Sequence, residues 1–526
     1  MILATLLAQL LGVKRSEAAG SSTNGSFLNN RQNAKFENED RSPLPQMSRF
    51  KSTPKTVAAS TPASVVAIPR AHWHAPVTLN QSTNVAPQLA SSSAAGAPNI
   101  VASLGFVLYC AYFLSGYAND WALRLISNRV YISTVTLLLL PVPWLLSGNA
   151  FRGLQRPVGR WWIAFLAFLL LATPFSMWRG GSATLMWNYV PRNFLTFFYI
   201  CAFVTTIRQC RVLMYVQITG AIILLLTCMK FGSVGTEEDG RFRIPESLFY
   251  SNSNDLALAL LLGVTAFLFL FYQPGVRARI AGVVGVLLSF MYGLKTGSRG
   301  CFLAAIVMFA VIFWSRKNKL KVAIIALPIL ALALQMLPSA TLHRLLLFGA
   351  APETLQAHSA SDQAAIDSQI ARQELFKKSV AYTASHPLFG VGPGQFALAV
   401  AGDSAKTGEH EEWLGPHNSY TQVSSECGIP AFICYCAVIV LSFRTNWRLY
   451  RQSRDNPALK EVASLSFCLL AAILVYAVST FFFHIAYSMY LPALAGFSLA
   501  VRLAAEPLLA SNSAGHLHAA AGRLRL

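Results

Sequence analysis

Arg299 is the residue of this sequence whose position is hardest to explain without a chemical role. It lies in the segment 296–300, Thr-Gly-Ser-Arg-Gly, where two apolar runs meet almost without a loop. If these apolar runs lie in a membrane, placing a charged side chain at that depth costs a free energy of about 2.5–3.5 kcal/mol or more. Such a residue therefore usually faces a polar cavity. An arginine that extends from a helix end toward water is the alternative. The small neighbours would let a ligand or a partner helix approach closely, and they favour a functional role.

Arg241 and Arg243 form a candidate anion site. They flank Phe242 in a loop of mixed charge, shortly before the polar segment 250–255 that should begin a helix. Guanidinium groups bind phosphate oxygens through paired hydrogen bonds, and helix N-termini add backbone donors. A solvated loop with local ion pairs is the alternative. The sequence leaves open which of the two arginines takes part.

His417 is the candidate general base. It opens the segment 417–420, His-Asn-Ser-Tyr, directly after a Gly-Pro pair. A histidine titrates near neutral pH and can accept a proton from a hydroxyl group. An ordinary loop residue is the alternative. His484 is a weaker candidate of the same kind, and Glu426 is placed to orient a histidine or to cap a helix.

The cysteines and histidines give no sign of a metal or cofactor site. The nine cysteines lie almost all in or beside apolar runs, with no Cys-X-X-Cys pair and no His/Cys ligand spacing. We therefore expect neither structural zinc nor a disulfide framework.

The elements that must position these residues are membrane helices. The chain has 526 residues, 54% hydrophobic and 12% charged, about half the charged share of a typical soluble domain. The apolar residues form runs of roughly 16–22, and about 20 helical residues cross a hydrocarbon core of about 30 Å. The net charge of +20 does not indicate nucleic acid, because the basic residues lie in short clusters between these runs.

The runs predict an all-α integral membrane protein with about 12 transmembrane helices. About nine of them are expected within residues 100–337 and about three within 427–503, separated by one large helical loop over 338–426. The individual spans are expected near 100–118, 130–147, 161–177, 193–207, 211–230, 252–272, 278–295, 299–314, 320–337, 427–443, 462–481 and 485–503.

Loop charges predict the orientation of these helices. If residues 338–426 lie outside, the basic connections fall inside at every step, as the positive-inside rule requires. Residues 1–99, which lack apolar periodicity after the first dozen positions, are then a disordered basic cytoplasmic tail, and 504–526 form a cytoplasmic C-terminal tail. Within the outer loop, 361–385 is helix-like, and the His-Pro pair at 386–387 should end that helix.

Several of the residues named above occur in one order along the outer face. A Ser-Arg-Gly junction at 298–300 opens a span, and the outer loop carries Arg372 and then His-Pro-Leu-Phe-Gly-Val-Gly-Pro-Gly at 386–394. The loop ends in His-Asn at 417–418, and Gly428 follows after nine further residues. From roughly residue 160 to 445, this arrangement resembles the O-antigen ligase and polysaccharide polymerase family of bacterial envelopes.

The resemblance implies a metal-independent glycosyltransferase of the bacterial inner membrane whose active site faces the periplasm. Its donor would be a glycan on undecaprenyl diphosphate, and its acceptor a sugar hydroxyl, which a membrane lipid can carry. Arg299 and one of Arg241 and Arg243 would hold the diphosphate leaving group, whose departure needs positive charge. His417 would activate the acceptor hydroxyl, and Arg372 would brace the loop or bind the donor.

The sequence leaves the acceptor open between three cases. A ligase would transfer to the lipid A core, a polymerase to a sugar on a second lipid carrier, and an oligosaccharyltransferase to protein. Ala431 stands where ligases often have Gly, Thr or Tyr, which tilts the interpretation toward a polymerase or exopolysaccharide assembly. A secondary transporter or lipid-linked glycan flippase is the alternative from another class, and such proteins often contain internal repeats, of which the sequence shows no convincing case.

Overall fold

A computed structural model describes most of the chain. The described residues are 99–126, 132–235, 241–247, 249–315, 360–407 and 414–523, together with single positions between 319 and 335. The expected N-terminal tail (apart from Asn99), nearly all of the span expected near 320–337 and the start of the outer loop, 338–359, lie outside these residues.

The described elements are helices apart from one pair of two-residue strands. The first part of the chain forms α2 (Ile100–Ile126), α3 (Ile132–Leu139), α4 (Pro141–Leu146), η1 (Arg152–Gln155), α5 (Pro157–Ala172), η2 (Thr173–Phe175), α6 (Arg179–Tyr189), η3 (Val190–Phe194), α7 (Thr196–Phe203), α8 (Ile207–Phe231), β1 (Ser233–Val234) and β2 (Phe242–Arg243). The second part forms α9 (Ser253–Phe267), η4 (Leu268–Tyr272), α10 (Val276–Lys295), α11 (Arg299–Ser315), α14 (Ala360–Ser385), α15 (Phe396–Thr407), α16 (Ser419–Ser453), η6 (Pro457–Leu459), α17 (Lys460–Ser479) and α18 (Tyr490–Arg523).

Eight helices in the described part of the chain are long and apolar enough to cross a membrane. Each overlaps a span expected from the sequence, and two shorter apolar helices, Ser133–Leu146 and Arg299–Phe313, overlap two more. The span expected near 193–207 is instead divided between the π-helix η3 and the short helix α7. Pro191 lies in η3, and proline lacks the N–H that a continuous helix needs. The chain is thus a multi-pass helical membrane protein, and the count of about 12 helices stays a prediction.

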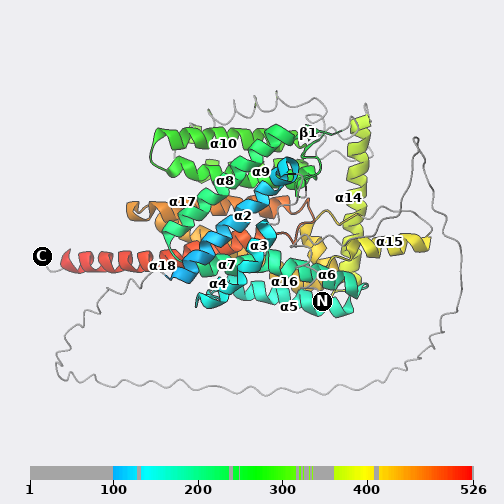
Figure 1. The fold of residues 1–526 in the computed structure, drawn as a ribbon, viewed down its shortest axis with the longest axis horizontal. Helices are drawn as coiled ribbons and strands as arrows, with labels where there is room; N and C mark the ends of the chain where they lie inside the picture. The colour runs from blue at the N-terminus through cyan, green and yellow to red at the C-terminus, as the bar shows by residue number, and fades with distance from the viewer. Residues whose placement is uncertain are drawn as a thin grey trace, which may run out of the picture. The chain divides into compact units, whose positions relative to one another are not determined.

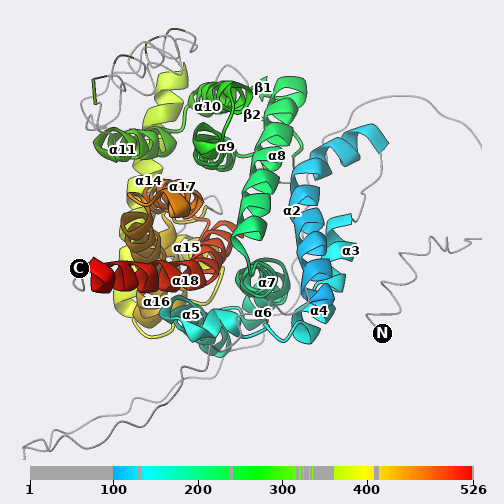
Figure 2. The same cartoon turned by 90° about the vertical axis from the view of Figure 1, so that its left-hand side faces the viewer.

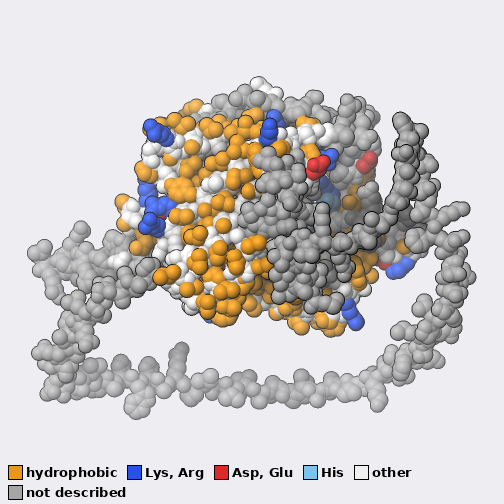
Figure 3. Space-filling model, viewed as in Figure 1, with side chains coloured by type: hydrophobic (Ala, Val, Ile, Leu, Met, Phe, Trp, Pro, Cys, Tyr) orange, Lys and Arg blue, Asp and Glu red, His pale blue; other side chains and the backbone are white. Residues whose placement is uncertain are grey.

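The long helix α14 lies across the direction of α9, α10 and α11. Helices α9, α10 and α11 run side by side and are seen end-on in Figure 2, whereas α14 crosses their direction beside one end (Figure 1). The helix predicted over 361–385 is confirmed, because α14 ends at Ser385, directly before the His-Pro pair. Hydrophobic side chains cover much of the described surface between the two ends of these helices, as a lipid-facing surface requires (Figure 3).

Helix α16 connects the membrane helices with the crossing helix, because it packs against α5, α17 and α14. The Asn418 side chain caps its first turn by accepting hydrogen bonds from the N–H groups of Tyr420 and Thr421. Gly428 then interrupts the helix with φ +83°, a conformation that favours glycine. Pro430 follows, so the two helical segments of α16 meet at a kink.

The glycine-rich segment 386–394 docks at this kink. The N–H of Val391 donates to the carbonyl of Ser425 at 2.8 Å. A Cβ atom on Gly428 would lie only 2.2 Å from the carbonyl oxygen of Leu388. The close approach of two backbones therefore requires a glycine at the kink, and it connects α14 firmly to α16.

Candidate functional site

The turn between α10 and α11 brings Arg241 and Arg299 to one end of the helices. After α10 ends at Lys295, Gly297 takes φ +61°, and α11 begins at Arg299. Arg241 Nε donates a hydrogen bond of 2.9 Å to the carbonyl oxygen of Thr296 within this turn. Two of the predicted anion-binding arginines, distant in sequence, therefore border the same turn.

An amide side chain orients each of these two guanidinium groups. Arg241 Nη2 donates to Asn254 Oδ1, in the first turn of α9, at 2.6 Å. Arg299 Nη1 donates to Gln369 Oε1, on α14, at 2.7 Å. An amide oxygen accepts a hydrogen bond without carrying a formal charge, so these contacts position the arginines without neutralising them.

Arg243 lies on strand β2, opposite Ser233 of β1. Successive side chains of a strand point to opposite faces, so Arg243 shares a face with Arg241, while Phe242 is buried on the other. The Phe242 ring packs against Tyr292 with 5.3 Å between ring centroids. The hydrogen bonds described above tie Arg241, and not Arg243, to the turn between α10 and α11.

His417 lies in a strained turn directly before α16. Its φ of +50° is in the left-handed region, which residues other than glycine rarely adopt. Its ring contacts that of His484 edge to face, with 5.0 Å between centroids. Gly415 makes room for this pair, because a Cβ atom there would lie 2.7 Å from Cδ2 of His484. Strained backbone of this kind is typical of functional sites.

The histidine pair is uncharged at neutral pH. Burial, followed by the nearby charges of His484, Arg372 and Arg241, lowers the pKa of His417 from 6.5 to about 3. The pKa of His484 is lowered too, first by desolvation and then by Arg372. Part of the His484 side chain is exposed to solvent, but protein surrounds the ring on its other sides. The ring is therefore desolvated enough for its pKa to be lowered.

Helix α14 joins the two parts of the site. Gln369 and Arg372 are spaced i, i+3 and therefore lie on one side of the helix. Gln369 binds Arg299, and the charge of Arg372 acts on His417. The structure thus brings Arg241, Arg299, Arg372 and His417 to one region from four separate segments, and places Arg243 beside it.

One face of the first turns of α16 holds the loop that carries His484. Three polar side chains, spaced i, i+3 and i+7, bind successive residues of that loop. These hydrogen bonds, of 2.6–3.1 Å, join Ser419 to Phe483 and Ile485, Gln422 to Ala486, and Glu426 to Tyr487. The position of the His484 ring over His417 is therefore built into the start of α16.

Glu426, which the sequence offered as a partner of a histidine or as a helix cap, instead joins two loops. Its buried carboxylate accepts a hydrogen bond of 2.7 Å from the Tyr487 hydroxyl and one of 2.9 Å from the N–H of Gly394. It fixes the glycine-rich segment and the His484 loop against α16. Its effect on the histidine pair is thus indirect.

Sequence reasoning did not identify Asn254 and Gln369 as site residues. Asn254 lies in the polar segment 250–255 that was already expected to begin a helix, and such starts often present side-chain ligands. Gln369 precedes Arg372 by one helical turn, which was the available signal that one face of the predicted helix carries both. Neither signal reveals the arginine that each amide binds.

The sequence profile of the O-antigen ligase family matches residues 284–436. The matched segment contains Arg299, Arg372 and His417, whereas Arg241 and His484 lie outside it. No curated protein matches the chain. The match confirms the resemblance predicted from the sequence: residues 284–436 of this multi-pass membrane protein are similar to the O-antigen ligase domain.

Proposed function

We propose that this protein transfers a glycan from undecaprenyl diphosphate to a sugar hydroxyl at the periplasmic face of the bacterial inner membrane. The family match supports glycosyl transfer and favours it over the transporter alternative. The observation that carries the proposal is the convergence of three arginines, Arg241, Arg299 and Arg372, with His417 at one end of the helices.

Arg241 and Arg299 would hold the diphosphate of the donor. The bond between the anomeric carbon and the diphosphate oxygen breaks, and its electron pair leaves with the diphosphate, where negative charge increases. Guanidinium groups already oriented by Asn254 and Gln369 stabilise that charge without reorganising. Because this charge is supplied by side chains, we propose that transfer needs neither a metal ion nor a cofactor.

His417 would accept the proton of the acceptor hydroxyl while the hydroxyl oxygen forms the new bond to the anomeric carbon. A neutral imidazole is ready to do so, but a pKa of about 3 makes it a weak base in the free protein. The bound diphosphate offsets the charges of Arg372 and Arg241, which raises the pKa of His417. The base would therefore gain strength only when the donor is in place.

The acceptor remains open among the lipid A core, a glycan on a second lipid carrier, and protein. The test is a reconstituted reaction with the full chain, undecaprenyl-diphosphate glycan and each acceptor in turn, with product and released undecaprenyl diphosphate measured together. The variant Arg299→Ala should lose transfer. Arg279→Ala is the matched control, because Arg279 is exposed on the same pair of helices toward the start of α10. Equal release of carrier by both variants would contradict the proposal.

A further inference from the structure

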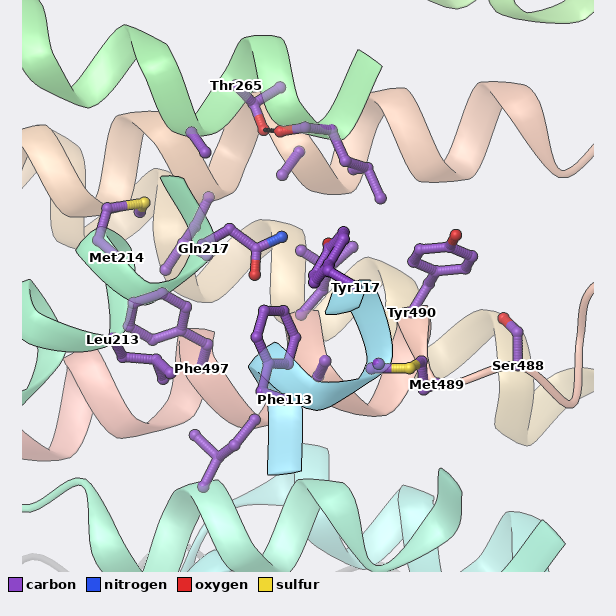
Figure 4. Close-up of a pocket in the computed structure, with 18 of the residues that line it drawn as sticks. Phe113, Tyr117, Leu213, Met214, Gln217, Thr265, Ser488, Met489, Tyr490 and Phe497 are labelled. Carbon is purple, nitrogen blue, oxygen red and sulfur yellow. Dashed lines mark hydrogen bonds between the residues drawn. The ribbon is translucent and has the colours of Figure 1, made fainter. Parts of the chain in front are cut away.

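A cavity of about 350 Å³ lies between the long helices, beside the arginine and histidine site. Its walls come from α2, α8, α9, α17 and α18, all of which contain candidate membrane spans. Figure 4 shows Met214 and Leu213 toward one end, Ser488 and Met489 toward the other, and Phe113 between them. Most of the lining side chains are apolar or aromatic.

The cavity is elongated along the helices. On α9 its lining residues run from Asp255 to Ala266, a distance of about 16 Å at 1.5 Å per residue. On α18 they run from Tyr490 to Phe497, or about 10 Å. A narrow apolar space of this length matches a single hydrocarbon chain better than a compact ligand such as a sugar.

One end of the cavity adjoins the functional site. Asp255 lines the cavity directly after Asn254, which binds Arg241. Ser488 lines it directly after Tyr487, which binds Glu426. Asp255 and Ser488 are polar lining residues at this end, and Ser488 Oγ is buried there without a hydrogen-bond partner in the described part of the chain. Farther along, the lining is mostly apolar, with Gln217 and Thr265 as polar exceptions, and the Thr265 hydroxyl donates to the carbonyl of Leu262.

The size of the cavity argues that it holds a ligand. An engineered apolar cavity of about 150 Å³ already binds benzene, and ligand sites in proteins typically begin at about 300 Å³. An empty apolar cavity also destabilises a protein in proportion to its volume. The cavity has too few polar groups to replace the hydrogen bonds that a sugar makes with water. A hydrocarbon chain makes no such hydrogen bonds and loses none on entering the cavity.

We infer that this cavity binds one hydrocarbon chain of a membrane lipid, with the polar end of that chain at Ser488 and the tail toward Met214. Two sources share this chemistry: the polyprenyl chain of a lipid-linked donor and the acyl chain of a phospholipid. Only the first source rests on the proposed function. In that case the cavity would hold the isoprene units nearest the diphosphate, beside Arg241.

The full-length protein in detergent would be photolabelled with two probes, a diazirine-bearing polyprenyl phosphate and a diazirine-bearing diacyl phosphatidylglycerol. Labelled peptides are then mapped by mass spectrometry. Gly116→Phe fills the cavity, because Gly116 lines it and has no atom within 4 Å of an added Cβ. Gly402→Phe is the matched control, since Gly402 on α15 also has open space beside it and does not line the cavity.

Labelling at Met214 or Met489 by either probe is expected, with a loss of at least about tenfold in Gly116→Phe and none in Gly402→Phe. The probe that labels identifies the source of the chain. Absence of label from both methionines with both probes, or equal label in Gly116→Phe, would overturn the inference. If Gly116→Phe does not fold, Ala493→Phe fills the same cavity, and competition by unlabelled lipid in the wild type must remove the label.

Transfer activity is measured separately on the same samples. If Gly116→Phe loses the label but transfers glycan at the normal rate, the cavity is assigned to a phospholipid chain and the proposed function is not contradicted. Label without transfer to any acceptor supports the cavity and contradicts the proposed function. The two failures are therefore distinguishable.

Discussion

The rings of His417 and His484 lie edge to face with their centroids 5.0 Å apart, although they belong to loops that are distant in sequence. The contact exists because Ser419 and Gln422, at the start of α16, bind the loop that carries His484. Two imidazoles this close, within reach of the charge of Arg372, both favour the neutral form. The pair therefore presents neutral ring nitrogens at physiological pH.

Replacement of His417 should separate catalysis from folding. We expect His417→Gln to reduce transfer about 10²–10⁴-fold, as for loss of a general base, while donor binding persists. The control is His484→Phe, which keeps a ring in contact with His417 but cannot carry a proton. It should retain more than about a tenth of wild-type turnover. The reverse pattern in steady-state assays would assign the base to His484.

The pH dependence should report the lowered pKa of His417. Because its pKa in the folded protein is about 3, the neutral form persists as the pH falls well below 6.5. We therefore expect kcat/KM, which reports the free protein, not to decrease near pH 6.5. Because the bound diphosphate raises the pKa of His417, kcat should begin to decrease at a higher pH than kcat/KM does.

Removal of one neighbouring charge should shift this profile. Arg372→Gln takes away a positive charge that lowers the pKa of His417, so the acid limb of kcat/KM should move to higher pH. The profiles must extend from neutral pH down to about pH 3 to show the shift, because the pKa of His417 in the wild type is about 3. An unchanged profile in this variant would indicate that Arg372 does not act on the base.

The geometry of Arg299, and not only its charge, should matter. Arg299→Ala should abolish transfer with normal membrane insertion, and Arg299→Lys should also be poor, because lysine lacks the planar fork that binds two oxygens. Lysine also lacks the planar guanidinium group that the hydrogen bond to Gln369 orients. Initial rates with saturating acceptor are the measurement. Wild-type activity in the lysine variant would contradict the proposal that Arg299 binds phosphate through paired hydrogen bonds.

Chelation should leave the reaction unaffected. If arginines supply the charge that stabilises the departing diphosphate, EDTA added to the purified protein should not change the rate of transfer. Added Mg²⁺ or Mn²⁺ should have no effect beyond ionic strength. A rate that falls with EDTA and returns with one of these ions would replace the arginine-only mechanism with one that includes a metal.

The orientation of α14 can be tested with single cysteines. Gln363 on α14 and Asp455 after α16 are both exposed, and the native cysteines described by the structure are buried or half-buried. A membrane-impermeant maleimide should label Gln363→Cys, but not Asp455→Cys, in cells with a permeabilised outer membrane. The opposite pattern would place the proposed site in the cytoplasm and contradict the proposed function.

Properties that depend on local sequence were predictable. Apolar runs of membrane-spanning length identified all eight candidate spans in the part of the chain that the structure describes, since the cost of unpaired backbone groups in lipid leaves few alternatives to a helix. The end of α14 at Ser385 followed from the His-Pro pair. In one place the apolar signal was not sufficient: the run predicted as one span near 193–207 is divided between η3, which contains Pro191, and α7.

Properties that depend on packing between distant segments required the structure. The residue types at Arg241, Arg299 and His417 indicated anion binding and proton transfer, but their spacing in the chain contains no information on which neighbours they meet. The hydrogen bond from Arg241 to Thr296 forms because Arg241, directly before β2, lies beside the α10–α11 turn, while Phe242 of β2 packs against Tyr292 of α10. The low pKa of His417 likewise arises from burial and from side chains on distant segments, since desolvation and charge act through space and not along the chain.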